Sequence, residues 1–177
     1  MTDLIKKNGV NFGLILGIVS ILIGATLYAI NLEFMVSFWI GIIIFFINIG
    51  IAIFAIIKSK KGMEGFISFK EAFTAYFITM AIGSAFYVVF MILLLNVIDP
   101  GAKEIISELL IEKTVTMMQG MNVPTDAIKE AVKNMQETDN FSPVSQALSY
   151  VWSLLFYIIV GLIIAAIFKK NKPMFEN

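Results

Sequence analysis

The chain has 177 residues, of which 59% are hydrophobic and 15% charged, and its mean hydropathy is +0.88. Thirteen basic residues balance 13 acidic ones, so the net charge gives no indication of a nucleic-acid partner. The absence of cysteine and histidine excludes disulfides, thiolate metal sites, cysteine nucleophiles and the commonest general base. This composition indicates several membrane spans and leaves few means for hydrolytic or metal chemistry.

The first apolar run predicts a membrane span over residues 10–30, directly after Lys6 and Lys7. A signal peptide is the alternative, but about twenty residues is longer than a typical signal-peptide core, so we interpret the run as a retained anchor. Small residues on one helix face allow a second helix to approach closely. We expect that contact within this bundle, with a dimer interface as the alternative. Four glycines form this face: Gly9, Gly13, Gly17 and Gly24.

A second span is predicted over residues 34–57, and the connection of residues 31–33 is so short that the first two spans should form an antiparallel hairpin. Asn48 lies near the middle of this second span. A polar amide in hydrocarbon needs a partner and usually faces other helices, so we expect an interhelical hydrogen bond rather than a functional role. Lys58, Lys60 and Lys61 then form a basic linker that includes Gly62.

The third span is predicted over residues 72–98. Ser68 and Glu71 have the spacing of a capping box, in which each side chain bonds the backbone N–H of the other residue. Ala75, Thr79 and Gly83 repeat every four residues and form a small-residue face, which we interpret as a helix-packing surface.

Residues 99–142 form the one substantial polar region, with eight acidic and four basic residues and hence a net charge of minus four. Asp99 and Pro100 are a typical helix start, and a second start follows at Pro124. The spacing predicts two amphipathic helices, with Asp126–Lys129 and Glu130–Lys133 as ion pairs. A row of three glutamates, which could hold a divalent cation weakly, is better explained as a solvated face: Glu104, Glu108 and Glu112.

Ser142 and Pro143 repeat the helix-start pattern before the fourth span, predicted over residues 144–168. Ser149, Ser153 and Gly161 share one face and are further candidates for helix packing. With four spans, both termini and the 58–70 loop lie on one side, which carries nine of the 13 lysines. The positive-inside rule therefore predicts cytoplasmic termini and an extracytoplasmic 99–142 region.

Several of these segments together resemble the DUF4199 family, which consists of small uncharacterised membrane proteins found mostly in Bacteroidota-type bacteria. The segments are Gly13 and Gly17, residues 67–73, Asp99-Pro100 and Ser142-Pro143. The resemblance covers nearly the whole chain and implies a bacterial cytoplasmic (inner) membrane location. It implies no activity and no site residues.

The predicted fold is all-α: a polytopic membrane protein with four transmembrane helices and an extracytoplasmic amphipathic helical hairpin between the third and fourth. We predict no enzyme activity, no catalytic or metal-binding residues and no cofactor, because the spans lack internal charges and a nucleophile elbow. The predicted function is a non-catalytic helix-bundle assembly or binding protein. The alternative is a subunit of a small-solute transporter or channel. Membrane lipid is the expected partner, with a second copy or another membrane protein as alternatives and no nucleic acid.

Overall fold

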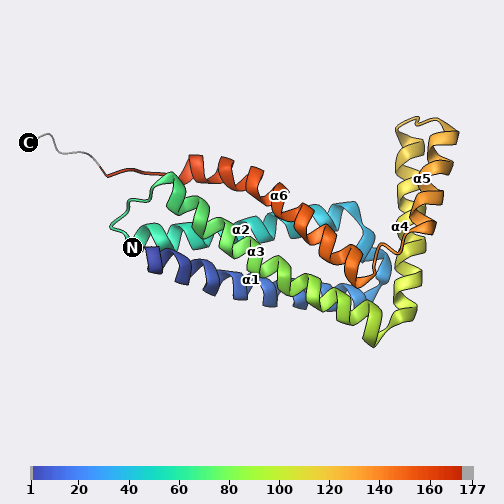
Figure 1. Cartoon of the computed structure of the whole chain (residues 1–177), viewed down its shortest axis with the longest axis horizontal. Helices are drawn as coiled ribbons and strands as arrows, with labels where there is room; N and C mark the ends of the chain where they lie inside the picture. The colour runs from blue at the N-terminus through green and yellow to red at the C-terminus, as the bar shows by residue number, and fades with distance from the viewer. Residues whose placement is uncertain (1, 173–177) are drawn as a thin grey trace, which may run out of the picture.

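The computed structural model describes residues 2–172, and that part of the chain is helical with one isolated β-bridge. Four helices are long and apolar enough to cross a membrane, as predicted. Figure 1 shows these four running side by side along the longest axis of the molecule. The elements are α1 (Thr2–Ile30), the 3₁₀-helix η1 (Leu32–Val36), α2 (Phe38–Gly62), α3 (Phe69–Leu93), the π-helix η2 (Leu94–Ile98), α4 (Pro100–Gly120), α5 (Thr125–Glu137) and α6 (Pro143–Phe168).

Helix α2 differs at both ends from the apolar run of residues 34–57 that predicts the second span. Asn31 accepts a hydrogen bond from the backbone N–H of Glu33 through its side chain, which starts the separate 3₁₀-helix η1, and α2 begins only at Phe38. At the other end α2 continues to Gly62, so Lys58, Lys60 and Lys61 belong to its last turns rather than to a linker. Gly62 does not prevent this extension, because a glycine in a helix costs only about 1 kcal/mol relative to alanine.

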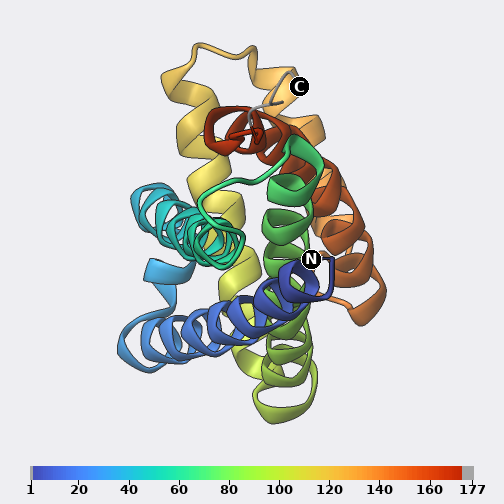
Figure 2. The same cartoon turned by 90° about the vertical axis from the view of Figure 1, so that its left-hand side faces the viewer.

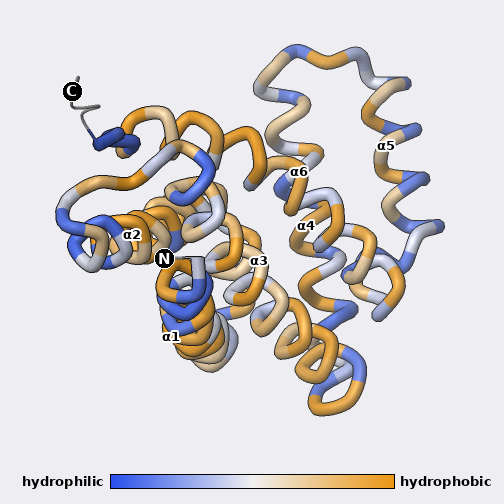
Figure 3. The backbone as a smooth tube through the Cα atoms, turned by 60° about the vertical axis from the view of Figure 1, so that its left-hand side comes forward, coloured by the Kyte–Doolittle hydropathy of each residue, from blue (hydrophilic) through white to orange (hydrophobic). Residues whose placement is uncertain are grey.

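Helix α3 is the centre of the bundle and packs against each of the other three spans. Viewed along the bundle in Figure 2, α1, α2 and α6 surround it. Its inner residues belong to a core with α1, α2 and α6 that includes Leu16, Ile56, Tyr76 and Ile164. The outward faces remain apolar, as in Figure 3, because lipid rather than water covers them.

The two ends of the bundle differ in structure. We call the end that carries the N-terminus, residues 58–70 and residues 169–172 the lysine end. At the other end, α4 and α5 lie side by side across the ends of the spans instead of continuing along them (Figure 1). We call this the hairpin end. A second core joins it to the bundle, with Ala102 and Ile106 of α4 buried against Met91, Leu94 and Leu95.

Candidate functional site at the hairpin end

The predicted small-residue faces of α1 and α3 meet each other. A Cβ at Gly9, Gly13 or Gly17 would lie 2.7–2.9 Å from the Cβ of a residue on α3. Gly24 faces the rings of Tyr87 and Phe90. Thr79 donates a hydrogen bond to the Gly9 carbonyl oxygen at 3.2 Å. These residues therefore form an interface within one chain.

Of the three small residues of α6 proposed for packing, Gly161 makes a contact between helices, whereas Ser153 and Ser149 have other surroundings. Gly161 of α6 packs on the rings of Tyr76 and Phe73, so it serves a contact between α6 and α3. The Ser153 hydroxyl donates to the Tyr150 carbonyl oxygen on its own helix at 2.7 Å. Ser149 instead lines a cavity at the hairpin end. Asn48 accepts a long hydrogen bond of 3.4 Å from Ser20 of α1, which supplies the expected interhelical partner.

At the lysine end, short polar contacts join the start of α3 to the residues after α6. The backbone N–H of Ser68 donates to Glu71 at 2.8 Å and Ser68 Oγ accepts from the Glu71 N–H, forming a capping box. The backbones of Ile67 and Lys170 exchange two hydrogen bonds, at 2.9 and 2.8 Å. Lys60 donates to the carbonyl oxygen of Phe168 and so satisfies the end of α6.

At the hairpin end, α4 is held at its start and again at Lys113. The hydroxyl of Tyr28 on α1 donates to Asp99 at 2.7 Å, and Asp99 also caps α4 by accepting from the Ala102 N–H. Further along α4, Lys113 donates to Glu33 of η1 at 2.6 Å. Because these partners come from α1 and η1, α4 is fixed across the bundle rather than tethered at one point.

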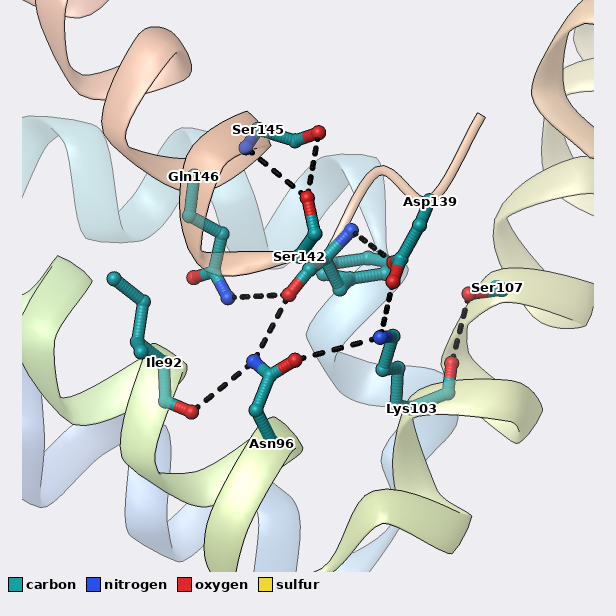
Figure 4. Close-up of polar contacts among 9 residues, drawn as sticks. Ile92, Asn96, Lys103, Ser107, Asp139, Ser142, Ser145 and Gln146 are labelled. Atoms are coloured by element: carbon teal, nitrogen blue, oxygen red, sulfur yellow. Dashed lines mark hydrogen bonds and ion pairs between the residues drawn. The ribbon is translucent and has the colours of Figure 1, made fainter. Parts of the chain in front are cut away.

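Asn96 is the centre of a polar network that joins α3, α4 and the start of α6, shown in Figure 4. Its amide donates to the carbonyl oxygens of Ile92 and Phe141 at 3.1 and 3.0 Å, and its oxygen accepts from Lys103. Lys103 also forms an ion pair with Asp139 in the connection between α5 and α6. The buried amide of Gln146 donates to the same Phe141 carbonyl oxygen at 2.9 Å.

These contacts favour the charged forms of the groups at the hairpin end. The hydroxyl of Tyr28 and the N–H of Ala102 hold the pKa of Asp99 below its usual value. The ammonium group of Lys103 lowers the pKa of Asp139, and Glu33 raises the pKa of Lys113. Each of these three shifts favours the charged form of the group, namely Asp99, Asp139 and Lys113.

Two adjoining cavities lie next to this network. The first, about 480 Å³, lies under α4 among η1, α3, the α5–α6 connection and α6. The second, about 270 Å³, runs between the spans to the level of Ser20 and Asn48. Met35 and Tyr87 line both, so the two cavities adjoin at these side chains, and we call the pair the crevice. All of its lining residues are neutral, and its polar groups are amides and hydroxyls.

No sequence pattern marks Asn96, Gln146, Tyr28 or Lys113 as an anchor of the hairpin. Asn96 and Gln146 are polar residues at the ends of apolar runs, which is the only local indication of a role. Among the ion pairs of α5, Asp126 and Lys129 lie 3.6 Å apart as predicted. The predicted pairing of Lys133 with Glu130 is wrong, since Lys133 lies 3.8 Å from Glu137 instead. The i, i+4 alternative is open to the same lysine on an exposed helix.

Four apolar helices joined in one bundle, with a polar helical hairpin across one end, define a multi-pass membrane protein. A family model described as "Protein of unknown function (DUF4199)" matches residues 11–170, and the chain belongs to this family. The resemblance noted in the sequence is thereby confirmed. Comparison with curated proteins finds no match, and comparison with solved structures finds none.

Proposed function

We propose that this protein is a non-catalytic binding protein that takes an uncharged amphiphile of the lipid class into the crevice at the hairpin end. The observation that supports the proposal is that two adjoining cavities with neutral linings share the side chains of Met35 and Tyr87. A ligand whose chain passes between Met35 and Tyr87 would extend from the rim under α4 to the middle of the bundle. Cavities of this size and largely apolar lining are typical of small-ligand sites.

The lining favours a long apolar group with hydrogen-bonding atoms at one end. Near the rim, Asn140 and Ser149 offer an amide and a hydroxyl to a headgroup, while Met91, Val88 and Leu110 provide apolar walls. A charged headgroup would have no counter-ion among the neutral lining residues, and an unpaired charge in such a site is costly. We therefore favour an uncharged headgroup, such as a glycerol or an alcohol.

The proposed location is the bacterial cytoplasmic membrane, with both termini in the cytoplasm and the hairpin end outside. The distribution of lysines supports this orientation, because nine of the 13 lie at the lysine end. The crevice would then open to the outer leaflet and the space beyond it. In this proposal membrane lipid is both the surroundings of the protein and the source of its ligand.

The test uses a photoactivatable monoacylglycerol with a diazirine in its acyl chain, incubated with the purified protein in lipid nanodiscs. We expect saturable labelling of peptides that line the crevice. Gly41 lines the deep cavity and has no atom within 4 Å of the position of a Cβ, so Gly41→Leu places an apolar side chain at the cavity from an open Cβ position. This variant should reduce labelling several-fold.

Gly50→Leu is the matched control, because Gly50 lies on the same helix, is equally open at its Cβ position and does not line the crevice. It should leave labelling unchanged. Equal labelling of Gly41→Leu and the unmodified protein would contradict the proposal, as would labelling confined to the lipid-facing surface of the spans.

The second candidate function is a subunit of a small-solute transporter or channel. The polar groups inside the membrane region of the crevice favour it, namely Ser20, Asn48 and Ser84. A flux assay in proteoliposomes with uncharged solutes tests this candidate. A solute-selective leak that Gly41→Leu abolishes would favour transport over simple binding.

A further inference from the structure

The face of α4 that packs on the bundle continues past the end of the bundle. Ala102 and Ile106 are buried against the ends of the spans. Leu110, Met117 and Met121 follow at helical spacing on the same face. Figure 1 shows that the joined ends of α4 and α5 extend beyond α6, so α6 does not lie beneath this part of the hairpin.

This continued face borders an open apolar groove of about 600 Å³. Val36 of η1 and Phe38 of α2 line one wall. The other wall is formed by five residues of α4: Leu110, Lys113, Thr114, Thr116 and Met117. Phe38 is 71% exposed, Met117 is 56% exposed and Met121 is 69% exposed. Exposure of such large side chains to water is unfavourable, so we expect an apolar surface to cover the groove.

The position of the groove relative to the spans indicates what surrounds it. Because α4 lies across the ends of four membrane spans, its bundle-facing side is at the level where the spans leave the bilayer. Phe38 and Trp39 mark the same level on α2, as aromatic residues commonly do at membrane interfaces. The opposite face of α4 carries the exposed Glu104, Glu108 and Glu112, which point away from the spans.

We infer that the distal half of α4 rests on the bilayer leaflet at the hairpin end and that the lipid surface occupies this groove. The bundle-facing side of the helix carries the exposed Met117 and Met121, which lipid would cover, and Glu104, Glu108 and Glu112 lie on the opposite side, toward water. The ion pair between Lys113 and Glu33 fixes the height of α4 above the spans. Helix α5 packs on α4 through Ile128 and lies farther from the bundle, on the water side.

The test exploits the absence of cysteine from the chain. Single-cysteine variants Met117→Cys and Met121→Cys carry a nitroxide spin label, and Glu108→Cys and Glu112→Cys are matched controls on the acidic face of the same helix. The proteins are reconstituted into vesicles of phosphatidylethanolamine and phosphatidylglycerol. Electron paramagnetic resonance then measures collisions with oxygen, which concentrates in lipid, and with a water-soluble nickel chelate.

We expect the ratio of oxygen to nickel accessibility to be several-fold higher at positions 117 and 121 than at positions 108 and 112. Equal ratios on both faces would overturn the inference, because they would place the groove in water. Spin–spin broadening at positions 117 and 121 would also overturn it, since a second copy of the chain would then cover the groove. The result is independent of the crevice, whose ligand binding is measured separately.

Discussion

Gly83 illustrates how single residues set the distance between helices in this protein. A Cβ at this position would lie 2.8 Å from both Cβ and Cγ of Leu16 on α1, closer than real Cβ contacts allow. In a membrane, where lipid is as apolar as the helices, such close packing is one of the main contributions to helix association. The small-residue pattern is therefore a requirement of packing.

Gly83→Ala should destabilise the bundle by about 1–3 kcal/mol, because the added methyl group overpacks the contact between α1 and α3. Thermal unfolding in a mild detergent measures the effect. Gly50→Ala is the control, since nothing lies within 4 Å of its Cβ position. An equal loss in both variants would indicate a general effect of alanine and not overpacking.

The hydrogen bond from Tyr28 to Asp99 predicts a pH-dependent contribution to stability. The pKa of Asp99 is lower in the folded protein than its ordinary value of about 4. The bond therefore stabilises the fold above that ordinary value, and the stabilisation is lost as the pH falls through the lower folded pKa.

Tyr28→Phe should accordingly lower the unfolding temperature at neutral pH, and its difference from the unmodified protein should shrink below about pH 4. Tyr150→Phe is the control, because the Tyr150 hydroxyl donates to the neutral carbonyl oxygen of Ala81 at 3.0 Å. Its effect should not vary with pH. The interpretation fails if both variants show the same pH profile.

At the scale of elements, the connection between the hairpin and the bundle depends on a few polar contacts. The short π-helix η2 ends α3, and within it Asn96 joins α3 to the connection between α5 and α6. Lys103 adds a link from α4 to Asp139 in the same connection. These bonds bring together segments that lie far apart in the sequence.

Asn96→Ala should loosen this connection, with a loss of about 1–2 kcal/mol for the unmade hydrogen bonds. Hydrogen–deuterium exchange should increase in residues 138–142 and at the start of α4, while α1 remains protected. Asn134→Ala provides the control, since Asn134 is exposed on α5. Faster exchange in both variants would show that the hairpin is loosely held regardless of Asn96.

For the whole molecule, the proposed orientation predicts which end is accessible from outside the cell. Glu130 is exposed on α5, and Lys61 is exposed in the last turn of α2. The two single-cysteine variants are therefore Glu130→Cys and Lys61→Cys. A membrane-impermeant maleimide should label the first in intact cells and the second only after the membrane is opened. The reverse pattern would contradict the assignment of the lysine end to the cytoplasm.

The sequence alone determined the features that depend on neighbouring residues. Four apolar runs gave the spans, and the side chains of Ser68, Asp99 and Ser142 mark three helix starts that the structure contains. Caps and hydrophobic runs are local, because their hydrogen bonds and their burial in lipid involve residues close in the chain. The start of α2 was missed because η1 and the first turn of α2 lie in the same apolar run, which does not mark where the 3₁₀-helix ends and the α-helix begins.

Only the tertiary structure decided which faces meet and which polar groups share a site. The pairing of Gly13 with α3, the bond from Tyr28 to Asp99 and the network at Asn96 all join residues distant in the sequence. Similarly, the crevice exists because Met35 of η1 and Tyr87 of α3 face the same space. The spacing of residues in a helix determines which of them share a face. Which residues of another helix meet that face depends on how the helices pack together.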